Sequence, residues 1–196
     1  MMAQKLDYLK ETPSQTAGPY VHIGLVPRQA GFEIYDNNFG NVIPGKGERI
    51  RIRGRVIDGT GAPLNDVLVE TWQADASGSF TNPEFRGWAR AGSDFETGEW
   101  VIETVRPGAA PNRDGATLAP QILFWIVARG INIGLNTRMY FPEDAAANAA
   151  DPVFRKVPPH RRETLLAQPG DRVDGVQEYR FDIHLQGARE TVFFDV

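Results

Sequence analysis

The sequence contains no cysteine among its 196 residues. This absence excludes disulfide bonds, thiolate nucleophiles and zinc sites built on cysteine, and it fits a reducing compartment such as the cytoplasm. Long apolar runs are also missing, since none approaches the ~20 residues that a membrane-spanning helix needs. The first residues lack the apolar core of a signal peptide. We therefore expect a cytoplasmic protein that makes no membrane contact.

An excess of positive charge is absent as well. The formal net charge is -4, with 21 Lys and Arg against 25 Asp and Glu. A chain with this balance lacks the electrostatic attraction to phosphate groups on which nucleic-acid binding depends, so nucleic acid is excluded as a partner. Apolar residues at 41% and charged residues at 23% are ordinary for a globular protein. The length predicts a single domain over residues 1–196.

Sequence motifs that would give this chain a catalytic or metal site of its own are also missing. The three histidines, His22, His160 and His184, form no His-x-His or His-Glu-x-x-His pair. Asp182 and His184 share one face of a predicted strand, and such a pair is usually plain surface. No Gly-x-Ser-x-Gly turn offers a nucleophilic serine. Taken alone, the residues favour a binding or accessory module.

What the chain does contain is an apolar run, Ile122 to Val127, preceded by Pro120 and followed by Gly130. Six apolar residues rich in β-branched and aromatic types are too few for a buried helix, so we predict a strand buried on both faces. Arg129 lies just after this run. An arginine there is most often a surface residue with a packed aliphatic stem, but it is also suited to a rim where a carboxylate docks.

Alternating apolar and polar residues predict further strands, and alanine-rich or Pro-initiated segments predict short helices. The predicted strands are 50–56, 67–72, 99–105, 122–127, 137–141, 178–186 and 191–196, and the predicted helices are 143–150 and 159–167. Residues 1–27 are predicted to form an N-terminal arm that packs on another surface, either of this chain or of a partner chain. Its segment 11–27 reads as extended and irregular, with a short final strand through Val21, Ile23 and Leu25. The fold class is all-β, a β-sandwich of two mainly antiparallel sheets.

Several motifs resemble the intradiol ring-cleavage dioxygenases. They are Glu11-Thr-Pro-Ser-Gln-Thr-Ala-Gly-Pro-Tyr20, Glu70-Thr-Trp-Gln-Ala-Asp-Ala-Ser-Gly78, Val105-Arg-Pro-Gly108, Ala128-Arg-Gly-Ile-Asn132 and Glu190-Thr-Val-Phe-Phe-Asp-Val196. The resemblance runs from the arm to the last residue. It implies a β-sandwich, in agreement with the strand pattern.

Catalytic members of the family hold a ferric ion with two tyrosines and two histidines. At the matching positions this chain has Phe80, Ala110, Gln121 and Leu123. Phenylalanine, alanine and leucine have no donor atom, and an amide is a poor ligand for Fe(III). The resemblance therefore implies degenerate ligand positions and no metal, and no catalytic residue of its own, in this chain.

The resemblance also implies an obligate hetero-oligomer. The Fe(III) would be held by a homologous beta chain, and this chain would complete the pocket in which 3,4-dihydroxybenzoate (protocatechuate) reacts with O2. Arg129 would reach the substrate carboxylate, and Thr16, Gly18 and Pro19 of the arm would line the pocket. Two alternatives stay open here. One is a stand-alone binding module for small aromatic acids, and the other is a self-sufficient dioxygenase with unorthodox ligands.

Overall fold

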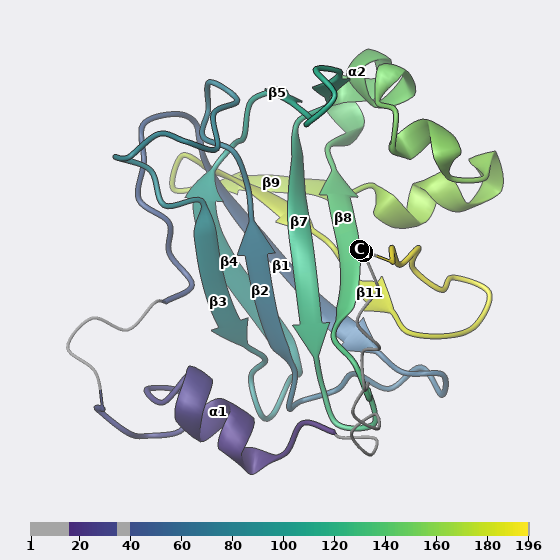
Figure 1. The fold of residues 1–196 in the computed structure, drawn as a ribbon. Coiled ribbons are helices and arrows are strands. Elements are labelled where there is room, and N and C mark those ends of the chain that lie inside the picture. Colours follow the sequence, from purple (N-terminus) through teal and green to yellow (C-terminus); the bar gives the residue numbers. More distant parts are fainter. Residues whose placement is uncertain (1–15, 35–39, 196) are drawn as a thin grey trace, which may run out of the picture.

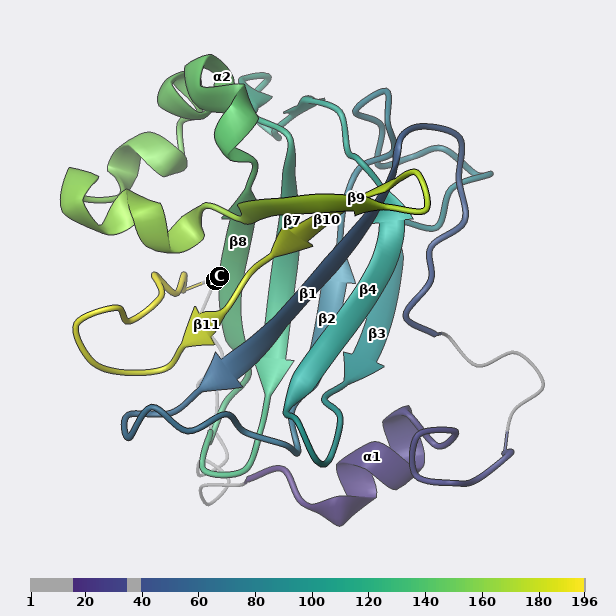
Figure 2. The same cartoon turned by 180° about the vertical axis from the view of Figure 1, so that it is seen from behind.

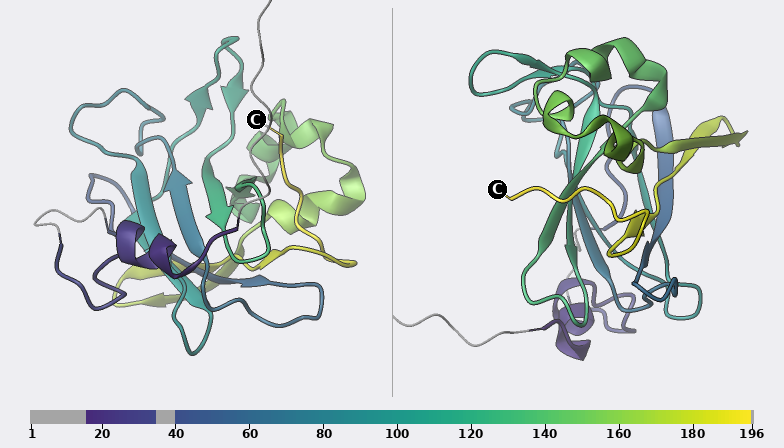
Figure 3. Two further views of the ribbon diagram at one scale, coloured as in Figure 1. Left: turned by 60° about the horizontal axis from the view of Figure 1, so that its bottom comes forward. Right: turned by 90° about the vertical axis from the view of Figure 1, so that its right-hand side faces the viewer.

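A computed structural model describes residues 16–34 and 40–195 of the chain. Two β-sheets pack face to face, with helical segments at their ends (Figure 1 and Figure 3). The all-β sandwich prediction is confirmed. The strands are β1 Arg49–Ile57, β2 Leu68–Trp72, β3 Trp88–Gly92, β4 Glu99–Val105, β5 Ala110–Pro111, β6 Thr117–Leu118, β7 Gln121–Val127, β8 Leu135–Tyr140, β9 Gln168–Val173, β10 Val176–Arg180 and β11 Ile183–His184.

One sheet is organised around β1, which pairs with β4 on one side and with β10 and β11 on the other, while β9 extends it beyond β10 (Figure 2). Burial alternates along β1 because successive side chains point to opposite faces of the sheet. The outward arginines do not simply face water. Arg51 pairs with Glu103 at 2.8 Å and with Glu178 at 2.9 Å, so this face of β1 carries an ion-pair network.

The second sheet has the order β3-β2-β7-β8 and is antiparallel throughout. Its β7 covers the predicted central strand, but the prediction that both faces of this strand are buried is wrong. Ile122, Phe124 and Ile126 are buried in the core, whereas Leu123, Trp125 and Val127 are only partly buried. The reason is architectural, since within residues 16–34 and 40–195 a second sheet packs on the inner face of this sheet only.

The core between the sheets is built from the inward side chains of both layers. Trp100 of β4, Phe124 of β7 and Phe181 form a chain of tilted aromatic contacts with ring centroids 5.3–5.4 Å apart. All three side chains are buried. Contacts of this kind add specific geometry to the burial of apolar area, so they fix how the two layers lie on each other.

The helical segments after β8 lie in the two regions, 143–150 and 159–167, where the sequence predicted helices. Residues 142–150 form a 3-10 turn, η1 Pro142–Asp144, and the helix α2 Ala145–Ala150, and a second 3-10 segment, η3, covers Pro159–Leu165. A further turn, η2, covers Phe154–Lys156. None of the helices in the described residues is long and apolar enough to cross a bilayer.

The predicted strand at Val21, Ile23 and Leu25 is wrong, because this segment is the helix α1 Pro19–Leu25. Three alternating positions are too few to separate a period of 2 from one of 3.6. Pro19 occupies the first helical turn, where its fixed φ suits a helix start. The helix buries His22, which the alternating pattern assigned to the polar face. The part of the arm at residues 1–15 lies outside the described residues.

Two further differences concern the C-terminal third. The predicted strand 178–186 is split into β10 and β11 around Phe181 and Asp182, and its first half pairs with β9, which the sequence pattern missed. Of the predicted strand 191–196, the described residues 191–195 form an isolated bridge between Asn136 and Phe194 rather than a longer strand, and Val196 lies outside the described residues. Residues 191–195 instead lie along β8, where Thr137 Oγ1 donates to the carbonyl of Val192 at 2.7 Å.

Candidate functional site

The four degenerate ligand positions lie near the beginning of β7. Gln121 and Leu123 alternate onto the same outward face of this strand, and Leu123 is opposite Trp72 of β2. Phe80 stacks on Trp72, with ring centroids 6.3 Å apart and planes within 10°. Ala110 belongs to β5, which pairs with β6 just before β7 begins. The structure therefore places these positions on adjoining elements.

The side chains present there do not fit a ferric ion. The amide of Gln121 is the one polar group among the four, and its Oε1 already accepts a hydrogen bond from Arg138 Nη1 at 3.0 Å. The ring of Phe80 has no anionic oxygen to donate and is stacked on Trp72. In the part of the chain that the structure describes, no group of three or more His, Asp or Glu side chains is arranged to hold a metal. We derive no metal chemistry for this chain.

The loop that carries Phe80 is held by Asp75. Its Oδ1 accepts hydrogen bonds from the backbone and hydroxyl of Ser77 and from the backbone of Ser79, and its Oδ2 accepts one from Asn82 Nδ2 at 2.7 Å. The hydrogen bonds from Asn82, Ser79 and Ser77 lower the pKa of Asp75 from 3.8 to about 2. Within this loop, Gly78 has φ +89, and a Cβ there would overlap the carbonyl oxygen of Ala109. The backbone conformation and the close approach of Ala109 therefore explain why the motif Glu70–Gly78 ends in glycine.

The second set of predicted site residues lies at the other end of β7. Gly18, Pro19 and Arg129 line one cavity of about 430 Å³, and Thr16 Oγ1 accepts a hydrogen bond from the backbone of Gly130 at 2.7 Å. Arg129 is 69% exposed and forms an ion pair from Nε to Asp66 Oδ2 at 2.6 Å. The sequence prediction grouped these four residues, and the structure brings them together.

The same cavity contains residues that sequence reasoning did not assign to the site. His22, Asp66 and Phe95 line it together with Ile23, Ala30 and Phe32. His22 is 5% exposed, and burial lowers its pKa below 6.5 although Asp66 acts in the opposite direction. Its ring lies 5.3 Å from that of Phe95. Only the helix α1 turns His22 inward, so an extended reading of the arm gave no signal for it.

The two places are well separated. Gln121 and Arg129 are eight positions apart along β7 and its extension, which corresponds to about 26 Å at a rise of ~3.3 Å per residue. Figure 1 shows β5 near the upper end of β7 and α1 beyond its lower end. Arg129 therefore does not serve the degenerate positions of its own chain.

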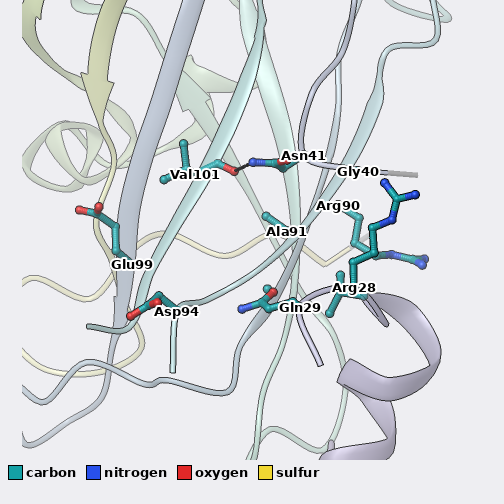
Figure 4. Close-up of a pocket in the computed structure, with 11 residues that line it drawn as sticks. Arg28, Gln29, Gly40, Asn41, Arg90, Ala91, Asp94, Glu99 and Val101 are labelled. Carbon is teal, nitrogen blue, oxygen red and sulfur yellow. Dashed lines mark hydrogen bonds between the residues drawn. The ribbon is translucent and has the colours of Figure 1, made fainter. Parts of the chain in front are cut away.

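Another cavity, of about 410 Å³, lies between the segment after α1 and the edge strands β3 and β4 (Figure 4). Its polar side chains are already used inside the chain. Gln29 Nε2 donates to the carbonyl of Ser93, Arg90 Nη1 donates to the carbonyl of Leu25, and Asn41 Nδ2 donates to the carbonyl of Val101. These contacts tie Leu25 of the arm, and Gln29 and Asn41 after it, to the sandwich, so we assign this cavity a structural role.

Asp182 and His184, the remaining pair noted in the sequence, also have structural partners. Asp182 accepts hydrogen bonds from the backbone of Arg55 at 3.0 Å and from Arg180 Nε at 2.8 Å. The backbone of His184 donates to Thr191 Oγ1 at 2.9 Å. Both residues are partly buried, and Asp182 lies between β10 and β11 whereas His184 belongs to β11, so the pair is not the plain surface of one continuous strand.

Comparison with known proteins places these features in a family. The family model described as Dioxygenase matches residues 34–187. The alpha chain of protocatechuate 3,4-dioxygenase from Pseudomonas putida is 46% identical over 97% of this chain and 98% of its own length. The beta chain of the enzyme of that name from Burkholderia cepacia is 35% identical over 74% of this chain and 67% of its own.

A solved structure agrees with this assignment. The 3-chlorocatechol 1,2-dioxygenase of Rhodococcus opacus 1CP superposes with a TM-score of 0.59 at 26% identity, over 73% of this chain and 63% of that one. Most of this chain therefore has the same fold as that enzyme. On the family match and the full-length similarity together, the chain belongs to the intradiol ring-cleavage dioxygenase family.

Proposed function

We propose that this chain is the alpha subunit of a heteromeric protocatechuate 3,4-dioxygenase. The complex would cleave 3,4-dihydroxybenzoate with O2 to 3-carboxy-cis,cis-muconate. The observation that carries the proposal is the 46% identity to an alpha chain over almost the whole of both chains. The homology to a beta chain supports a hetero-oligomer of two related subunits. A large interface of the obligate kind would join them.

In this proposal the Fe(III) belongs to the beta chain. Intradiol dioxygenases are iron enzymes, and the four degenerate positions here offer a single amide that is already hydrogen-bonded to Arg138. Because three of these side chains have no donor atom and the amide of Gln121 is already hydrogen-bonded, the iron site is better placed in the partner. The isolated chain would therefore be inactive, and its work would be to bind and orient substrate.

The residues for that work would be Arg129 and the arm. The guanidinium of Arg129 is mostly exposed, so it is free to reach a carboxylate held by a neighbouring subunit. Gly18 and Pro19 border the same cavity, where glycine permits close approach and proline fixes the backbone. The hydrogen bond between Thr16 and Gly130 fastens the arm beside Arg129. Residues 1–27 would in this way form the part of a single domain that contacts the partner.

A stand-alone binding module for aromatic acids is not favoured. Nearly the whole chain matches nearly the whole length of a named enzyme subunit. A cytoplasmic location remains a prediction that rests on the absence of cysteine.

The test is Arg129→Ala in the enzyme assembled with its beta chain. Loss of a charge-assisted contact worth ~2 kcal/mol predicts that the KM for protocatechuate rises about 30-fold while kcat is kept. Steady-state kinetics measure both. The matched control is Arg113→Ala, which removes an exposed arginine in the turn between β5 and β6, at the other end of β7. An unchanged KM in the Arg129 variant would refute the substrate role of this residue, and an inactive wild-type complex would refute the function.

A further inference from the structure

Asp66 and Arg129 face each other across two paired strands. In the antiparallel ladder of β2 and β7, Leu68 is opposite Val127, and continuing this register by two residues places Asp66 opposite Arg129. The ion pair joins Asp66 Oδ2 to Arg129 Nε at 2.6 Å. Nε is the nitrogen nearest the aliphatic stem. Among the described residues, the two terminal Nη groups of Arg129 have no partner.

The acid is held more firmly than the arginine. Asp66 is 24% exposed, against 69% for Arg129. The next residue, Val67, is held by the fully buried Ser93 through two hydrogen bonds. The backbone N–H of Val67 donates to Ser93 Oγ at 3.0 Å, and the backbone N–H of Ser93 donates to the carbonyl of Val67 at 2.8 Å. The long, exposed side chain of Arg129 is thus held at Nε by the carboxylate of Asp66, which lies beside a firmly hydrogen-bonded residue.

A contribution to folding does not explain this pair. An ion pair with one partner this exposed adds little to stability, because water screens it and ordering the side chain costs entropy. The other oxygen of Asp66, Oδ1, is buried and has no hydrogen-bond partner among the described residues. Burying a carboxylate oxygen in this way is unfavourable, so Asp66 has a local energetic cost that this ion pair does not offset.

We propose that Asp66 is a positioning residue for Arg129. It holds the guanidinium through Nε, so that the two Nη groups remain available as a fork for the substrate carboxylate. This inference rests on the proposed function of Arg129. An arginine ordered before binding does not have to lose its rotamer freedom when the substrate arrives, and this ordering is worth about two- to tenfold in affinity.

The experiment compares Asp66→Ala, Asp66→Asn and wild type in the assembled enzyme. Two compounds are used, protocatechuate and catechol, which lacks the carboxylate. We expect Asp66→Ala to raise the KM for protocatechuate about two- to tenfold with kcat unchanged. The affinity for catechol, measured as KM or as an inhibition constant, should stay the same. Asp66→Asn keeps an oxygen opposite Nε and is expected to lie between wild type and Asp66→Ala.

The outcomes separate the possible roles. A KM for protocatechuate that is unchanged or lower in Asp66→Ala would overturn the proposal, since it would mean that Asp66 is neutral or repels the substrate. Equal losses for both compounds, or failure to assemble, would indicate a general structural role and also overturn it. The control Asp114→Ala removes an exposed acid near β6. If wild type cleaves protocatechuate and only the Asp66 result fails, the proposed function stands without this inference.

Discussion

At the scale of single residues, Asp75 is the clearest case of one side chain ordering a segment. Its carboxylate accepts four hydrogen bonds from Ser77, Ser79 and Asn82, which close the loop that carries Gly78 and Phe80. The pattern Asp-x-Ser-x-Ser was visible in the sequence, but it indicated only a turn. The number of donors that converge on one carboxylate depends on the folded path of the loop.

We predict that Asp75→Asn lowers the free energy of unfolding by about 1–3 kcal/mol, because an amide NH2 would face donors that now meet a carboxylate. The pKa of Asp75 is lowered from 3.8 to about 2 in the folded chain. Its stabilising effect is therefore fully present above pH 3.8 and is lost as the pH falls toward about 2.

Urea unfolding of the wild type and of Asp75→Asn at several pH values from neutral to acidic measures the difference in their free energies of unfolding. The difference between the two proteins should shrink across that window. The control is Asp114→Asn, at an exposed position, which should leave stability nearly unchanged. A difference that persists at full size below pH ~2 would contradict the assignment.

At the scale of elements, the strands with long alternation were predictable and the short ones were not. The nine residues of β1 alternate without exception between buried and half-buried, as their apolar and charged residues required. β3, with Trp88, Ala89, Arg90, Ala91 and Gly92, was missed inside a segment rich in turn formers. The same limit produced the wrong strand in the arm, where Val21, Ile23 and Leu25 fit a helix equally well.

The close packing of β1 against Phe181, the residue between β10 and β11, can be tested directly. The backbone of Phe181 donates to the carbonyl of Arg53, and the carbonyl oxygen of Phe181 lies against Gly54. A Cβ on Gly54 would overlap that oxygen and lie 2.8 Å from Trp100 Cζ2. Gly54→Ala should therefore lower the free energy of unfolding by ~3 kcal/mol, because both neighbours belong to the packed core.

Thermal or urea denaturation of the variant checks this. The matched control is Gly24→Ala in α1, whose Cβ would meet no atom within 4 Å. That change should be neutral or slightly stabilising, since alanine favours a helix over glycine. Equal stability of Gly54→Ala and wild type would mean that β1 and Phe181 are not packed as closely as described.

At the scale of the whole molecule, the two sets of predicted site residues lie at opposite ends of β7. One end offers a single amide, which is already hydrogen-bonded to Arg138, and the other presents Arg129 beside Gly18 and Pro19 of the arm. A chain organised in this way is expected to complete a neighbour's site rather than its own.

This arrangement predicts the metal content of the chain. Expressed alone, it should bind no stoichiometric iron and should have no activity toward protocatechuate, because a single occupied amide cannot replace four ligands. Co-expression with a beta chain should give iron and activity together. Elemental analysis and oxygen uptake measure these quantities, with the beta chain expressed alone as the control. About one iron atom per isolated chain of this protein would contradict the proposal.

The sequence alone determined the fold class and the strand positions with long alternation, and its resemblance to the intradiol dioxygenases implied degenerate iron-ligand positions at Phe80, Ala110, Gln121 and Leu123. The first two follow from local periodicity and the third from matching motifs, and neither kind of signal depends on distant neighbours. Only the tertiary structure decided that α1 is a helix with His22 buried, that β7 is covered on one face, and that Asp66 meets Arg129. Each of these depends on strand register and on which layers pack together, and residues distant in the sequence set both.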